Sequence, residues 1–233
     1  VTGVQTCALP ISLSAVAEHG WTDDVLAAAI ARAGIDAPLA ARAFPDGARS
    51  LVEAFHEHCD RLMVEALSAQ NLEAMRTGQR IHAAVRARLE VMHPLRAQLR
   101  RAIAFQSLPQ NAVSGARCVA RTVDLIWRET GDRSHDFSFY TKRATLAAVY
   151  SATVLYWLQD ESADYAETWS FLQRRLTDVV SFGKARQAAQ ATAAGLAGSL
   201  VSGAWTTIRR AGSLSRWLGS RGTPPAWPRS SDR

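Results

Sequence analysis

The chain has 233 residues, which suits one domain with additional segments or two small domains, and its 48% hydrophobic content is enough for a core. Its formal net charge of +6 is unevenly placed: residues 181–233 hold 8 Lys/Arg and one acidic residue, whereas residues 1–180 hold 19 Lys/Arg and 20 Asp/Glu. Three cysteines without a spaced motif argue against a disulfide framework, and no segment reaches the roughly 20 apolar residues of a membrane-spanning helix.

The sequence does not begin with methionine, and residues 1–11 resemble a translated sequencing adapter joined to a truncated reading frame. We therefore expect this segment to be non-native and set it aside from the predicted fold, with Leu13–His19 as the remnant of a first helix.

Residues 12–60 predict a helix-turn-helix. Thr22 and Asp23 are good N-cap residues for a helix that ends at Gly34, and Asp36 starts a short second helix. This arrangement is typical of DNA-binding repressors. However, residues 13–60 hold eight acids and three arginines, and a net charge of −5 repels a polyanion. Arg42 is the sole basic residue of the second helix, so a scaffold without DNA contact is the favoured interpretation.

Residues 61–183 predict a helical bundle, with breaks at Pro94, Pro109, Gly131 and Asp160. The predicted helices after residue 77 cover Gly78–Met92, Pro94–Phe105, Gln110–Glu129, Tyr140–Gln159 and Asp164–Phe182. The run Ala144–Leu158 has no charged residue and is apolar on all sides, which predicts a buried central helix.

The stretch Asp136-Phe137-Ser138-Phe139-Tyr140-Thr141-Lys142-Arg143 leads into this helix. Together with the helix and with Tyr165, Trp169 and Phe171, it resembles the ubiquinone-biosynthesis lipid-binding accessory family, and the resemblance extends from about Leu13 to Trp217. The resemblance implies an all-α, TetR-like bundle that serves the di-iron demethoxyubiquinone hydroxylase. It implies no catalytic residue, no metal and no cofactor of the chain's own.

Adjacent side chains on a helix point about 100° apart, so Phe139 and Tyr140 do not both face one core. An exposed aromatic beside an arginine is typical of an interface hot spot. The resemblance places the hydroxylase-docking patch at Phe139, Tyr140 and Arg143, with Ile126 and Trp127 as weaker candidates. The family often has Trp where this chain has Phe139.

The resemblance also implies a bound isoprenoid quinone lipid. The candidate lipid-binding residues are Leu146, Val149, Tyr150, Val154, Trp157 and Trp169. Periodicity alone does not distinguish a packed core from a core with a ligand cavity, and the oligomeric state is left open between monomer and homodimer.

Residues 184–218 predict an amphipathic helix with an arginine-rich polar face, followed by a Pro/Ser/Arg-rich disordered tail at residues 219–233. The candidate membrane-binding residues are Leu196, Leu200, Trp205, Ile208, Arg209, Arg210 and Trp217. Packing of this helix on its own domain or on a dimer partner is the alternative. A peripheral position on the cytoplasmic side of the inner membrane is expected.

Two Glu-x-x-His pairs, Glu53/His56 and Glu90/His93, also suit di-iron bundles, with Glu129 and Glu167 as single ligands. Both pairs precede both single glutamates, whereas the usual bundle interleaves them, so solvent-facing residues explain the pattern more simply. No nucleophile elbow, P-loop or dinucleotide fingerprint is present in the sequence. The sequence therefore predicts an accessory lipid-binding protein that is not an enzyme, with a ligand-responsive DNA-binding repressor as the alternative.

Overall fold

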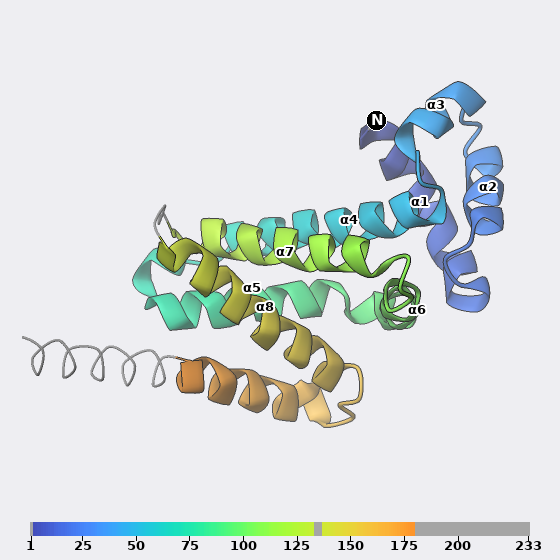
Figure 1. The fold of residues 1–233 in the computed structure, drawn as a ribbon. Coiled ribbons are helices and arrows are strands. Elements are labelled where there is room, and N and C mark those ends of the chain that lie inside the picture. Colours follow the sequence, from blue (N-terminus) through green and yellow to red (C-terminus); the bar gives the residue numbers. More distant parts are fainter. Residues whose placement is uncertain (1, 133–136, 180–233) are drawn as a thin grey trace, which may run out of the picture. The chain divides into compact units, whose positions relative to one another are not determined.

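The computed structural model describes residues 2–132 and 137–179, which form helices joined by turns, with no β-strand among them (Figure 1). The helices are α1 (Thr2–His19), α2 (Asp23–Arg32), α3 (Ala37–Ala43), α4 (Ala48–Ser68), α5 (Thr77–Val91), α6 (Arg96–Gln106), α7 (Ala112–Glu129) and α8 (Phe137–Trp157). Short 3-10 turns lie at η1 (Leu72–Ala74), η2 (His93–Leu95) and η3 (Ala163–Tyr165), and residues 166–179 are helical. The predicted all-α fold is confirmed.

The first helix is longer than the sequence suggested. α1 runs without interruption through residues 2–19 although Pro10 lies inside it. Ala8 and Leu9 are buried in the main core, and Gln5 Nε2 donates a hydrogen bond to the Ala43 carbonyl at 3.0 Å. Residues 2–11, which the sequence analysis set aside, therefore pack as part of α1. Their adapter origin is a separate prediction, which packing does not test.

The predicted helix-turn-helix is formed by α2 and α3. The Thr22 hydroxyl caps α2 by accepting a hydrogen bond from Val25 N, and Gly34 ends it with a positive φ of 62°. The unit continues directly into α4, whose first turn is fixed by Asp23 Oδ1 accepting from Ala48 N at 2.7 Å. Because α4 spans residues 48–68, the predicted boundary between residues 60 and 61 falls inside one helix and does not separate two units.

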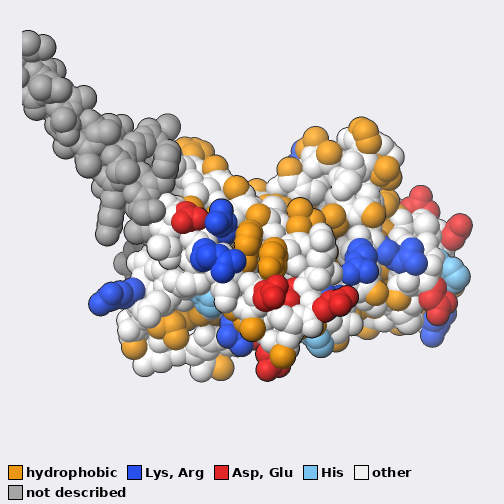
Figure 2. All heavy atoms as spheres, turned by 90° about the horizontal axis from the view of Figure 1, so that it is seen from below, with side chains coloured by type: hydrophobic (Ala, Val, Ile, Leu, Met, Phe, Trp, Pro, Cys, Tyr) orange, Lys and Arg blue, Asp and Glu red, His pale blue; other side chains and the backbone are white. Residues whose placement is uncertain are grey.

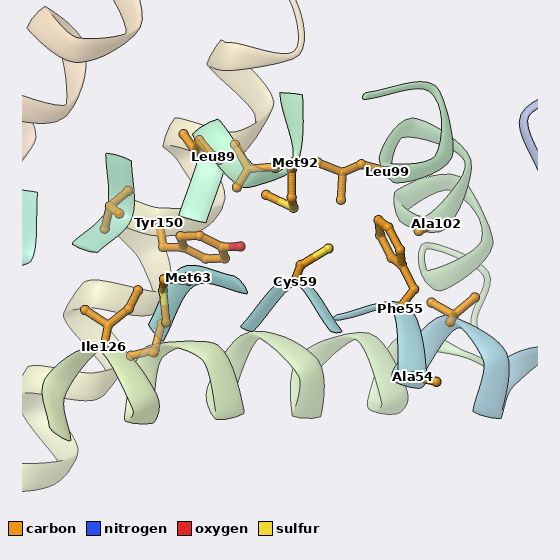
Figure 3. Packing of buried hydrophobic residues seen from close by; sticks show 14 of the residues in the cluster. Ala54, Phe55, Cys59, Met63, Leu89, Met92, Leu99, Ala102, Ile126 and Tyr150 are labelled. Atoms are coloured by element: carbon orange, nitrogen blue, oxygen red, sulfur yellow. The ribbon is translucent and has the colours of Figure 1, made fainter. Parts of the chain in front are cut away.

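The centre of the bundle is formed by α4, α5, α7 and α8. α4 packs against α5 and α7, and α8 packs against α7 (Figure 1). Their inward faces carry large side chains that are fully buried, among them Phe55 and Met63 of α4, Leu89 of α5 and Ile126 of α7 (Figure 3). Burying such a side chain contributes about 1.5–3 kcal/mol, so this core supplies much of the stability.

The C-terminal end of α8 is held by side chains from elsewhere in the bundle. Arg96 Nη2 donates to the Trp157 carbonyl at 2.8 Å, and its Nη1 donates to the Tyr165 hydroxyl at 3.0 Å. A cation at a helix C-terminus is favoured by the helix dipole. Asp160 then caps the next helix by accepting from Ser162 N and Thr168 N, at 2.8 and 2.9 Å. These contacts fix both the end of α8 and the start of the helix at residues 166–179.

The chain divides by compactness into Val1–Val179 and Val180–Arg233. The predicted amphipathic helix at residues 184–218 and the tail at 219–233 lie outside the described residues. So do all the candidate membrane-binding residues, namely Leu196, Leu200, Trp205, Ile208, Arg209, Arg210 and Trp217. Among the described residues, no helix is both long and apolar enough to cross a bilayer.

Candidate functional site

The candidate lipid-binding residues of α8 share one buried face. Leu146, Val149, Tyr150, Val154 and Trp157 are all at least nine-tenths buried and belong to the main core. The prediction of a buried central helix holds for this face alone, because Ala144, Ala148 and Ala152 are exposed and Leu155 is 50% exposed on the opposite face. Contact between the buried residues and a lipid stays a prediction.

Trp169 is the sixth candidate and lies apart from that face. It is half-buried, its Nε1 donates to the Asp164 carbonyl at 2.8 Å, and the Arg86 guanidinium stacks on its ring at 4.9 Å. Trp169 therefore packs at the edge of the core, against α5.

A cluster of charged side chains, which the sequence analysis did not single out, lies buried beside the α8 face. Arg88 of α5 is 0% exposed, and its Nε donates to Asp60 Oδ1 of α4 at 2.9 Å. The same oxygen accepts from the Thr122 hydroxyl at 2.8 Å, and Asp60 Oδ2 lies 3.4 Å from Arg121 Nε. Arg121 also pairs with Glu57. We call Asp60, Arg88 and Thr122 the buried polar cluster. Arg121 and Glu57 lie at its outer edge, where their side chains are 37% and 46% exposed.

The buried polar cluster affects neighbouring titratable groups. Burial, helped by the positive charge of Arg88, lowers the pKa of His56 to about 3, so its imidazole is neutral at physiological pH. Burial raises the pKa of Tyr150 to about 12, which outweighs the opposite effect of Arg88. Burial likewise raises the pKa of the Cys59 thiol. The centre of the bundle thus keeps these three side chains uncharged beside the ion pairs.

The docking patch at the start of α8 has one well-exposed member. Tyr140 is 71% exposed, while the Phe139 ring lies edge-on to it with centroids 5.1 Å apart. The prediction that the two aromatics face different environments is confirmed, since Phe139 is half-buried.

Arg143 is not the exposed cation that the sequence suggested. Its side chain is 14% exposed and stacks on the Phe139 ring at 3.4 Å. Its Nε donates to Asp124 Oδ1 at 2.6 Å, and its Nη1 lies 3.3 Å from Asp132 Oδ2. Arg143 therefore ties the start of α8 to α7 and holds Phe139 in place. Its role in this geometry is to position the aromatic pair.

Two weaker docking candidates are core residues. Ile126 is 0% exposed and Trp127 is 9% exposed, so Ile126 presents no surface to a partner and Trp127 presents little. The expectation that they extend the exposed patch is wrong, because α7 turns this face towards the bundle. Lys142 lies 5.5 Å above the Trp127 ring and pairs with Asp132. These contacts leave Tyr140 as the principal exposed aromatic of the predicted patch.

A second surface combines two aromatic rings with an arginine. Tyr156 and Phe171 stack in parallel with centroids 4.7 Å apart, and Arg175 lies 5.5 Å from the Phe171 ring. We call Tyr156, Phe171 and Arg175 the aromatic–arginine surface, which joins α8 to the helix at residues 166–179. Trp169 contacts Arg86 of α5 on another side of that helix. Figure 2 shows hydrophobic side chains beside Lys and Arg groups on the face seen from below.

The residues of the di-iron alternative are engaged in other contacts. Glu53 accepts a hydrogen bond from the Ser114 hydroxyl, and His56 Nε2 lies 3.3 Å from Gln106 Oε1. Glu90 pairs with Arg86. Within residues 2–132 and 137–179, no three His, Cys, Asp or Glu side chains form a group suited to a metal ion.

The comparisons with known proteins agree on fold and family. A family model described as COQ9 matches residues 112–183. Human mitochondrial ubiquinone biosynthesis protein COQ9 is 31% identical over 215 residues, which cover 89% of this chain and 67% of the human protein. The mitochondrial COQ9-B of Xenopus laevis is also 31% identical over 215 residues, covering 89% and 73% of the two chains. A TetR transcriptional regulator from Nitrosomonas europaea superposes with a TM-score of 0.58 at 19% identity, covering 75% of this chain and 97% of the other, so the fold is TetR-like. With relatives of this identity and coverage, the chain belongs to the COQ9 family.

Proposed function

We propose that the protein serves ubiquinone biosynthesis as a lipid-binding accessory, without catalysing a reaction itself. It takes a polyprenylated quinone intermediate from the membrane and presents it to the di-iron demethoxyubiquinone hydroxylase. The observation that carries this proposal is the construction of α8. One helix bears a buried apolar face suited to an isoprenoid tail and, at its start, an exposed tyrosine next to Phe139, whose ring Arg143 holds in place.

The energetics favour a protein that works at the membrane. Moving an isoprenoid tail from a bilayer into an apolar core exchanges one oily medium for another, so the tail contributes little net affinity. Carrying the same tail through water exposes its apolar area, at roughly 25 cal/mol per Å². A carrier of this kind therefore avoids the cost of exposing the tail to water if it receives and releases its ligand while bound to the bilayer surface.

Membrane contact is supported by two features of the chain. Residues 181–233 carry 8 Lys/Arg and one acidic residue, and a basic amphipathic helix of this kind suits an anionic lipid surface. The aromatic–arginine surface offers Tyr156 beside Arg175, and tyrosine is favoured at the bilayer interface. We propose a peripheral position on the inner membrane, with residues 184–218 as the main anchor.

Mass spectrometry of the lipid that co-purifies with the full chain tests the central claim. We expect a polyprenylated ring compound in wild-type protein, and its absence from protein prepared in ubiquinone-producing cells would refute lipid binding. Flotation with anionic liposomes tests the anchor separately. Leu200→Glu with Ile208→Glu should abolish flotation, and Ser199→Glu with Ser202→Glu on the polar face serves as the charge-matched control.

The repressor alternative is disfavoured by charge. Residues 13–60 carry a net charge of −5, and the short helix α3 offers Arg42 as its sole base or phosphate donor. A mobility-shift experiment separates the two functions. Tight, salt-sensitive binding of genomic DNA fragments would overturn the accessory function in favour of a repressor.

A further inference from the structure

The guanidinium of Arg88 is not fully partnered, although it is completely buried. Its Nε donates to Asp60 and its Nη2 donates to the His56 carbonyl at 3.3 Å. Within the described part of the chain, its Nη1 has no hydrogen-bond partner. Buried donors without an acceptor are costly and uncommon, and a donor on a charged group is the most costly kind. An acceptor supplied from outside the chain would resolve this imbalance.

The charge around Arg88 indicates what kind of acceptor fits. In the buried polar cluster the Arg88 cation is already balanced by the Asp60 anion, and at the partly exposed edge of the cluster Arg121 pairs with Asp60 and Glu57. The neighbouring His56 imidazole is neutral because its pKa is lowered to about 3. An anionic ligand would add an uncompensated charge to a buried site, which is unfavourable. The fitting acceptor is therefore a neutral oxygen, such as a carbonyl or a phenolic hydroxyl.

The surroundings of the cluster indicate what should bear that oxygen. Tyr150, Cys59 and Met92 are at least nine-tenths buried, and Figure 3 shows the Tyr150 ring and the two sulfur-bearing side chains directed towards one region of the core. Aromatic rings and sulfur atoms are favourable neighbours for a flat ring. Tyr150 also belongs to the α8 face that we propose as the binding surface of the isoprenoid tail.

We propose that Arg88 Nη1 is the donor that recognises the oxygenated ring of the bound lipid. The ligand class is a neutral quinone or quinol ring with an isoprenoid tail, with the ring oxygen at Arg88 and the tail along the α8 face. This inference rests on the proposed lipid-binding function and adds a ring-binding subsite to it. An isoprenoid tail contributes a similar binding free energy whatever ring it carries. The protein therefore distinguishes one isoprenoid lipid from another at the ring-binding subsite.

Binding of two probes to the full chain tests the subsite. The probes are a short-tailed ubiquinone and squalene, an isoprenoid hydrocarbon without a ring oxygen, and the readout is quenching of tryptophan fluorescence. The variant combines Arg88→Met with Asp60→Leu, because removing both charges avoids leaving an unpaired buried ion. We expect its affinity for the quinone to fall about 10- to 100-fold, as for loss of a hydrogen bond to a charged group. Its affinity for squalene should change less than about twofold.

Thr153→Val provides the matched control on α8. Thr153 is 0% exposed, but its hydroxyl donates to the Val149 carbonyl of the same helix, so its removal should leave both affinities unchanged. Infrared spectroscopy of a carbonyl-labelled ubiquinone bound to wild-type protein needs no variant. We expect one of the two carbonyl stretches to move to lower frequency through the charge-assisted hydrogen bond.

The outcomes separate this inference from the function on which it rests. Unchanged quinone affinity in the folded double variant, an equal loss for squalene, or two unshifted carbonyl stretches would each overturn the ring-binding role of Arg88 while lipid binding stands. If the wild-type protein binds neither probe, the proposed function fails and the inference fails with it.

Discussion

His56 should make the protein markedly less stable in mildly acidic solution. Its pKa is lowered to about 3 in the folded protein, chiefly by burial and then by the charge of Arg88, against about 6.5 in an unfolded chain. Between pH 7 and 5 the unfolded chain therefore takes up most of one proton at this residue, while the folded protein takes up almost none. Stability falls as pH falls, because the unfolded state binds more protons.

The size of this loss of stability depends only on the pKa of His56 in the unfolded chain, since its pKa in the folded protein lies well below 5. Integrating the proton uptake from pH 7 to 5 gives a loss of about 2 kcal/mol from His56. The Asp160 carboxyl does not contribute in this window. Although burial acts in the opposite direction, hydrogen bonds from Ser162 and Thr168 lower its pKa to about 2, so its stabilising effect is lost only at more acidic pH.

Urea unfolding of the wild type and of His56→Gln at the two pH values measures this effect. The glutamine keeps an amide N–H for Gln106 but does not titrate. The wild type should lose about 2 kcal/mol more than the variant between pH 7 and 5. His58 and His82, whose pKa values are also lowered by burial, are present in both proteins and cancel in the comparison. Between about pH 7.5 and 9 both should respond equally, and equal losses between pH 7 and 5 would refute the reasoning.

Four further substitutions are tested by urea unfolding, and Tyr140→Ala is also tested by a hydroxylation assay. Arg143→Met should lower stability by about 1–3 kcal/mol, because Asp124 and Asp132 each lose a cationic partner and keep Arg128 and Lys142, respectively. Unchanged stability of Arg143→Met would contradict the positioning role. Tyr140→Ala should change stability by less than about 0.5 kcal/mol, yet it should lower hydroxylation by the proposed partner enzyme. Arg96→Met should lower stability by about 1–3 kcal/mol through loss of the contacts at the end of α8, and an unchanged midpoint would show that those contacts are dispensable. Gly47→Ala should destabilise by more than about 1 kcal/mol, since φ is 57° and the added Cβ would collide with the Asp23 carboxylate; a neutral effect would mean that this turn relaxes freely.

Local signals in the sequence were sufficient for most helix boundaries. Thr22 caps α2, and Gly34 ends it with a positive φ. The lack of charge in Ala144–Leu158 correctly indicated a helix of the core, because ionised side chains are rarely tolerated inside a core without partners. It also predicted too much burial, since Ala148, Ala152 and Leu155 are exposed. These features depend on neighbours in the sequence, so they are visible without knowledge of the tertiary packing.

The sequence-based predictions failed for side chains whose role depends on a helix that is distant in the sequence. Arg88 and Asp60 lie 28 positions apart, and each taken alone is a single charge on an amphipathic helix. A charged residue on an amphipathic helix usually faces solvent. The one local sign that Arg88 is buried is its position in the apolar stripe, since it follows Ala84 and Val85 at helical spacing. Ile126 could have been assigned to the core from the sequence, since it continues the face of Val123 on the same helix.

The packing of α1–α3 explains how a helix-turn-helix can have a role that does not depend on DNA. Trp21 is buried in the main core, where its Nε1 donates to the Gln98 carbonyl of α6 at 3.1 Å, and Gln98 Nε2 donates to the Leu13 carbonyl of α1 at 2.9 Å. Asp23 fixes the first turn of α4, the helix that supplies Asp60 to the buried polar cluster. Removing these helices would expose apolar surface of the bundle and release α4. The fold therefore requires the helix-turn-helix unit even though the negative charge of its surface repels a nucleic acid. For the same reason, an architecture shared with a transcriptional regulator does not by itself indicate a function in transcription.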